Sequence, residues 1–222
     1  MSLRTVLATF LLCASMLVAT SAHAQAVSPT PDRDKTWAAV TGLTMVAGAG
    51  TQLLMPRVFY SDPEVTVGWK GRWHVSVLAP VMTLTVLTAL NEFALKDAFA
   101  GNRPGCDDTN RGIVSHCDSY GMMSTHTFAA ASALGHGVGV FVFDTLKWSG
   151  GRVNGYALTG NVIAPFVFGV LTGVGRGLGN WENAGQIVLG GVTGLGIGFL
   201  SGMTYAIMQR PECGYTGSLI CW

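Results

Sequence analysis

Five long apolar segments limit what this chain can fold into. They span Trp37–Met55, Val75–Leu95, Thr127–Leu146, Tyr156–Val174 and Ile187–Met208. Each is close to the roughly 20 residues that a helix needs to cross the hydrocarbon core of a bilayer. Inside a bilayer a single segment satisfies its own backbone hydrogen bonds only as a helix. We therefore expect an all-α, polytopic membrane bundle of five helices, embedded in a lipid bilayer.

The composition excludes other classes of protein. Only 11% of the 222 residues are charged and 49% are hydrophobic, whereas a soluble domain usually carries about 25% charged residues. Disordered chains combine low hydrophobicity with high charge, which is the opposite pattern. The net charge of +1 gives no sign of a nucleic-acid partner. The length fits one domain, which we place at residues 25–222.

The N-terminus has the pattern of a secretory signal peptide. Arg4 precedes the apolar run Val6–Val18, and the tripeptide Ala22-His23-Ala24 follows. A charged start, a short apolar core and an A-x-A site predict cleavage after residue 24. The alternative is a signal anchor that is retained as a sixth transmembrane helix. Both readings place residue 25 outside the cytoplasm, so we expect a multi-pass protein of a bacterial-type inner membrane.

Glycines repeat every fourth residue on the last two segments. The last segment carries Gly190, Gly194, Gly198 and Gly202, and the one before it carries Gly169 and Gly173. Small residues at this spacing let two membrane helices approach closely. We predict a packing seam inside one bundle rather than a dimer interface, and the pattern leaves the oligomeric state open.

Two pairs of cysteines differ in their predicted surroundings. Cys106 and Cys117 fall in the long loop between the second and third segments, on the outer side, where the oxidising compartment favours a disulfide. Two free thiols are the alternative. Cys213 and Cys221 follow the last segment, on the side where thiols stay reduced. No metal-ligand spacing is present, and we expect neither a metal nor an organic cofactor.

Ionisable and polar side chains gather at the ends of the segments rather than in their middles. They are Lys96, Arg103, Ser124, His126, Arg176, Glu182 and Gln186. Alternating helix directions bring all of them to one membrane face. Arginine forks pair well with tetrahedral oxyanions, and a serine at a helix start adds backbone donors. This chemistry predicts a phosphate pocket on the outer face, and Glu92 is expected to pair with Lys96 one turn away.

Three motifs in this region resemble signatures of the type 2 phosphatidic acid phosphatase superfamily, which includes lipid phosphatases and vanadium haloperoxidases. Lys96 to Pro104 reads K-x6-R-P. Ser124-Thr125-His126 is similar to P-S-G-H, with Met123 and Thr125 in place of proline and glycine. Arg176-x5-Glu182-x3-Gln186 keeps the spacing of S-R-x5-H-x3-D. The three motifs follow in the order of the family, over about Leu95 to Gly191.

The resemblance implies roles for the matched residues. Lys96, Arg103 and Arg176 would hold the phosphate oxygens and stabilise a pentavalent transition state. Ser124 would donate a hydrogen bond to the phosphate, and His126 would protonate the leaving alcohol. The implied substrate is a phospholipid or a polyprenyl phosphate or pyrophosphate, entering from the bilayer.

The chain departs from the family at the nucleophile. Glu182 stands where the family has its attacking histidine, and Gln186 stands where an aspartate orients that histidine. Three readings are open: Glu182 attacks phosphorus, Glu182 activates a water, or the nucleophile is lost. The first two describe a phosphatase or phosphotransferase with an altered nucleophile. The third describes a pseudophosphatase that binds a phosphorylated lipid or a partner without cleaving it.

Overall fold

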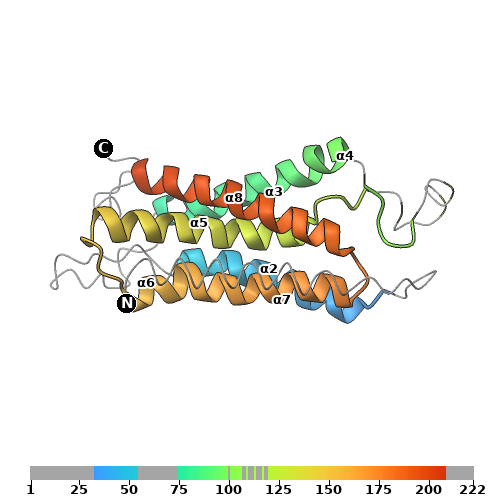
Figure 1. Cartoon of the computed structure of the whole chain (residues 1–222), viewed down its shortest axis with the longest axis horizontal. Helices are drawn as coiled ribbons and strands as arrows, with labels where there is room; N and C mark the ends of the chain where they lie inside the picture. The colour runs from blue at the N-terminus through green and yellow to red at the C-terminus, as the bar shows by residue number, and fades with distance from the viewer. Residues whose placement is uncertain are drawn as a thin grey trace.

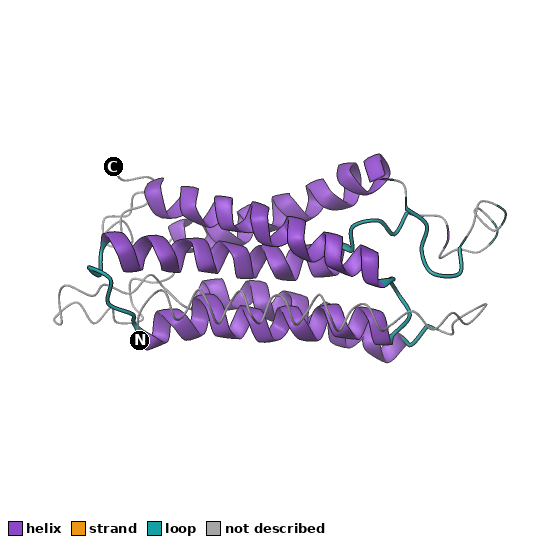
Figure 2. Ribbon diagram, viewed as in Figure 1, coloured by secondary structure: helices purple, strands orange, loops and turns teal. Residues whose placement is uncertain are grey.

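The structure, a computed structural model, describes residues 33–54, 75–99, 101–106, 109, 113, 117 and 120–208 (Figures 1 and 2). The predicted signal peptide and the pair Cys213 and Cys221 lie outside the described residues. Within those residues the fold is entirely helical and contains the five helices that the sequence predicts. The all-α bundle is therefore confirmed.

Two of the five helices contain a short π-helical stretch. The first helix is α2, Lys35–Leu54. The second is α3, Val75–Leu90, which continues through the π-helix η2, Asn91–Leu95, into α4, Lys96–Phe99. The third is α5, Thr125–Lys147. The fourth is formed by α6, Gly155–Leu158, the π-helix η4, Thr159–Ile163, and α7, Ala164–Leu178. The fifth is α8, Ala184–Met208.

Three of these helices are long and apolar enough to cross a membrane: Thr125–Lys147, Gly155–Leu178 and Ala184–Met208. Their length and composition identify a membrane protein whose natural environment is a lipid bilayer. The remaining two helices, α2 and α3, expose large apolar side chains such as Leu43 and Val86.

Helix α5 is the centre of the bundle. It packs against α2, α3, α7 and α8, and the helices run roughly along one axis (Figure 1). Leu134, Val138 and Phe141 of α5 belong to the apolar core, together with Ala157 and Val162 of the fourth helix. The residues at the start of α5 are therefore held between neighbouring helices.

The glycine repeat of α8 is a seam against α5. A Cβ atom on Gly190, Gly194, Gly198 or Gly202 would lie under 3.0 Å from a backbone carbonyl oxygen of α5. These four carbonyls belong to Ser124, Phe128, Ser132 and His136. The prediction of an intrachain packing seam is confirmed, because only glycine lets the two backbones come this close.

The loop between α4 and α5 is closed by a disulfide. Cys106 and Cys117 are bonded, with their Cα atoms 5.5 Å apart, as the sequence predicts. The residues 101–106 of this loop carry Arg103 and run beside the start of α8, where the Gln186 side chain donates to the carbonyl of Asn102. The loop between α4 and α5 and the start of α8 thus lie at the same end of the bundle.

Candidate functional site

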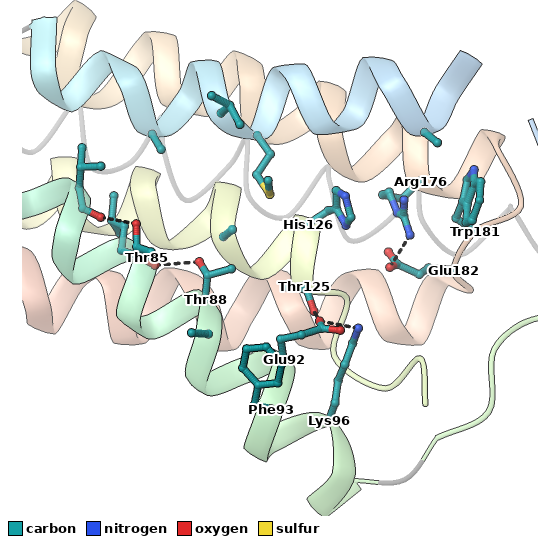
Figure 3. A pocket seen from close by; sticks show the side chains of 18 of the residues that line it. Thr85, Thr88, Glu92, Phe93, Lys96, Thr125, His126, Arg176, Trp181 and Glu182 are labelled. Carbon is teal, nitrogen blue, oxygen red and sulfur yellow. Dashed lines mark hydrogen bonds and ion pairs between the residues drawn. The ribbon is translucent and has the colours of Figure 1, made fainter. Parts of the chain in front are cut away.

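A cavity of about 910 Å³ runs from this end of the bundle along the space between α2 and α3 (Figure 3). Five of the seven catalytic and phosphate-site residues predicted from sequence line it: Lys96, Arg103, His126, Arg176 and Glu182. They come from α4, α5, α7 and the loops that precede α5 and α8. The predicted convergence of cations and a histidine at one depth is therefore present in the fold.

Lys96 lies at one side of the cavity, at the end of the π-helix η2. Its Nζ donates to Oε2 of Glu92 at 2.7 Å, which confirms the predicted pair. The hydroxyl of Thr125 donates to the same carboxylate oxygen. Asn91 donates through Nδ2 to Thr125 Oγ1 at 3.2 Å. This network joins the α3 side of the cavity to the first turn of α5.

Arg176 and Glu182 form a second ion pair across the cavity. Nη2 of Arg176 donates to Oε1 of Glu182 at 2.9 Å, and both side chains are buried. The loop after α7 turns back so that Trp181 N donates to the Arg176 carbonyl at 3.1 Å. Two further atoms of the pair, Arg176 Nε and Glu182 Oε2, are buried without a hydrogen-bond partner among the described residues.

His126 lines the same cavity, on the side of Arg176 (Figure 3). It lies in the first turn of α5, directly after Thr125. Within the described residues its ring takes part in no hydrogen bond that would fix its tautomer. The ring is therefore part of the cavity lining and has no hydrogen-bond partner among these residues.

Ser124 does not line the cavity, and its contacts are those of a helix cap. Its Oγ accepts from Thr127 N at 3.2 Å, and the residue is fully buried beneath α8. The preceding Met123 has φ of 57°. Proline, the family residue at that position, is held near −65°, so this turn departs from one that a proline would form.

Gln186 also lies outside the lining of the cavity. Its Oε1 accepts from Asn183 N at 2.9 Å, and Asn183 Oδ1 accepts from Gln186 N at 2.9 Å. This reciprocal pair is a capping box that begins α8. Its Nε2 donates to the Asn102 carbonyl at 2.8 Å. In the described part of the chain none of these bonds reaches Glu182, so Gln186 holds the loop rather than the carboxylate.

Sequence reasoning missed Arg33 and Trp181. The guanidinium carbons of Arg33 and Arg176 lie 5.1 and 5.2 Å from the centre of the Trp181 ring. Trp181 Nε1 donates to the Asp34 carbonyl at 3.0 Å, which holds the segment before α2 against the site. Burial, with Arg103 and Arg176 nearby, lowers the pKa of Arg33. No local spacing in the sequence indicates the contact of Arg33 with Trp181, because these two residues are far apart in the chain.

The other end of the cavity is apolar. It is lined there by α2 and α3, including Met45 and Val46 on the first and Val81 and Leu84 on the second. Val46 and Phe93 border the cavity and are 62% and 80% exposed, so the cavity opens to the surroundings between these helices. The lining of α2 extends from Ala38 to Gly50, about 18 Å at the rise of an α-helix.

No protein-family model, curated protein or solved structure matches the chain. The resemblance to lipid phosphatases therefore rests on the three motifs alone. Among the described residues no group of three or more histidine, cysteine, aspartate or glutamate side chains is arranged to hold a metal ion.

Proposed function

We propose that this protein is an integral membrane protein, similar to lipid phosphatases, that binds a phosphorylated lipid. The observation that carries the proposal is one cavity with a charged end and an apolar end. A phosphate headgroup would lie among Lys96, Arg103 and Arg176, and a lipid tail would lie between α2 and α3. Ligand sites usually combine an apolar lining with a few convergent polar groups, and this cavity does so.

The ligand class follows from the charges that line the cavity. Arginine supplies paired donors for phosphate oxygens, and lysine adds a point charge. Val46 and Phe93 are exposed beside the cavity, so a lipid from the bilayer would enter between α2 and α3. Candidate ligands are a phospholipid or a polyprenyl phosphate or pyrophosphate. In the orientation that the signal sequence implies, the charged end faces the periplasm of an inner membrane.

Binding without cleavage fits the contacts of Glu182 best. Its Oε1 already accepts from Arg176, so part of its negative charge is engaged. Gln186, which would have to orient a nucleophile, is used in the cap of α8 and in the tether to Asn102. A carboxylate that neutralises a binding cation is a poor replacement for a free histidine nucleophile.

Hydrolysis is the second candidate function, favoured by the presence of His126 and Glu182 on one cavity and by the Oε2 atom of Glu182, which has no hydrogen-bond partner among the described residues. In that reaction Oε2 attacks phosphorus and forms an acyl phosphate while the P–O bond to the lipid breaks. His126 gives its proton to the departing alkoxide. Water then gives a proton to the neutral His126 and attacks the acyl phosphate, the P–O bond to Glu182 breaks, and the release of inorganic phosphate leaves the carboxylate and the protonated histidine restored.

One experiment tests both candidates. The full chain is purified in phosphatidylcholine nanodiscs with a low mole fraction of phosphatidate, and retained lipid and released phosphate are measured together. We expect phosphatidate to be retained, Arg176→Ala to lose it, and no phosphate to be released. Arg152→Ala is the control, because Arg152 lies in the loop between α5 and α6, whereas His126 lies at the other end of α5. Equal retention by wild type and Arg176→Ala would contradict the proposal, and release that needs Glu182 would establish hydrolysis.

A further inference from the structure

The ion pair in the cavity has one donor and one acceptor left over. The Arg176 and Glu182 side chains are only 5% and 2% exposed, yet Arg176 Nε and Glu182 Oε2 have no hydrogen-bond partner among the described residues. Both residues line the cavity. A buried polar atom without a partner costs about 1–3 kcal/mol, and more for a charged group. The occupant of the cavity is therefore expected to offer an acceptor to Nε and a proton donor to Oε2.

Glu92 is the other carboxylate that lines the cavity, and its Oε2 already has hydrogen-bond donors. Oε2 of Glu92 accepts from Lys96 and from Thr125, both within its own network. The charged and titratable groups that face Glu182 are Arg176 of α7, Arg33 before α2 and His126 of α5. Arg176 reaches Oε1, and neither Arg33 nor His126 is bonded to Oε2 in the described structure. A ligand could therefore supply the hydrogen-bond donor that Glu182 Oε2 lacks among the described residues.

We propose that Glu182 makes this site selective for a phosphate group that carries a proton. The P–OH of a phosphomonoester would donate to Glu182 Oε2, and an anionic oxygen of the same group would accept from Arg176 Nε. A phosphomonoester has a second pKa near 6, so this proton is available close to neutral pH. A phosphodiester and a sulfate ester have no such proton and would place a lone pair against the carboxylate. The inference rests on the proposed function and specifies its headgroup.

Three probes with the same tail test the inference: hexadecyl phosphate, its methyl diester and hexadecyl sulfate. Each is placed at low mole fraction in phosphatidylcholine nanodiscs that contain the full chain at pH 6, and the retained probe is quantified by native mass spectrometry. We expect hexadecyl phosphate to bind at least about tenfold more tightly than either of the others, because one charge-assisted hydrogen bond is lost and a repulsion is added.

Two variants assign the selectivity to Glu182. In Glu182→Gln the amide can donate as well as accept, so the preference over hexadecyl sulfate should disappear. In Glu92→Gln the affinity for all three probes should change together while their ratio stays as in the wild type. If Glu182→Gln still prefers hexadecyl phosphate over hexadecyl sulfate, the inference is overturned, since another group would then accept the hydrogen bond from the P–OH.

The binding of the three probes to the wild type distinguishes an incorrect headgroup preference from an incorrect lipid-phosphate site. If all three probes bind the wild type equally, the site binds anionic lipids without reading their protonation, and only the inference is overturned. If none of them binds to protein that retains its helical circular dichroism spectrum, the site is not a lipid-phosphate site, and both are overturned.

Discussion

Arg176 and Glu182 are joined by a buried ion pair, with 2.9 Å between Nη2 and Oε1. Glu182 stands at the position of the histidine in the signature that the sequence resembles. Relative to that signature, a carboxylate replaces the histidine, and the same carboxylate engages the Arg176 guanidinium. Lys96 repeats the arrangement with Glu92 on the other side of the cavity.

Breaking the buried pair from one side should destabilise the protein. Glu182→Ala leaves Arg176 as a buried charge without its carboxylate, and we expect a loss of about 3–5 kcal/mol in the free energy of unfolding. The double variant Glu182→Ala with Arg176→Ala should recover part of this loss, because no charge is then left unpaired. Unfolding in mixed micelles measures both. Additive effects of the two substitutions would show that the pair contributes nothing.

Removing the charge of Glu92 should strengthen binding of an anionic lipid. Glu92→Gln leaves Lys96 without its neutralising partner, so the positive potential of the cavity rises. We expect hexadecyl phosphate to bind about tenfold more tightly, or about 1.4 kcal/mol. Retention in nanodiscs measures the change. Weaker binding in this variant would mean that Glu92 holds Lys96 in the productive position rather than competing with the ligand.

The α5–α8 seam offers a matched pair of substitutions on one helix. A Cβ on Gly198 would meet backbone atoms of Ser132 at under 3.0 Å, whereas a Cβ on Gly196 has nothing within 4 Å. We expect Gly198→Ala to lower the free energy of unfolding by at least about 1–3 kcal/mol through overpacking. Gly196→Ala should be neutral or slightly stabilising, because alanine favours a helix over glycine. Equal effects of the two would contradict the seam.

Gln186 has two roles, in the cap of α8 and in the hydrogen bond to Asn102, and two substitutions distinguish them. Gln186→Glu keeps an oxygen that accepts from Asn183 N but loses the donor to the Asn102 carbonyl, whereas Gln186→Ala loses both. We expect both variants to loosen the loop that carries Arg103 and to weaken lipid binding. Only Gln186→Ala should also lose the cap, at a further cost of about 1 kcal/mol in stability. If neither variant changes binding, the tether does not position Arg103.

Most of the fold could be predicted because it depends on short-range patterns. The five apolar segments predict the five helices, since a helix in a bilayer satisfies its own backbone. The glycine spacing predicts that the last segment has a close-packing face, although the structure alone shows that its partner is α5. The pair Glu92 and Lys96 follows from one helical turn. The Cys106–Cys117 disulfide follows from two cysteines in one loop. Each of these features links residues close in sequence or repeated along one helix.

The site could be predicted only in part, because it depends on where side chains at helix ends point. Five residues that the motifs select, Lys96, Arg103, His126, Arg176 and Glu182, line one cavity. The motifs also select Ser124 and Gln186, which the fold uses to begin α5 and α8. A serine before a helix and a glutamine in its first turn suit both a ligand and a cap, and the backbone donors of the helix start decide between them.

The sequence by itself determined that this chain is a helical membrane protein with cations gathered at the ends of its helices, because hydrophobic length and helical periodicity act locally. The tertiary structure alone decided three things: that Glu182 pairs with Arg176, that Arg33 reaches Trp181, and that the space between α2 and α3 joins the charged end. The contact of Arg33 with Trp181 requires segments distant in sequence to meet, because the segment before α2 packs on the loop after α7. The pair of Arg176 and Glu182 depends on the turn after α7, in which Trp181 N donates to the Arg176 carbonyl.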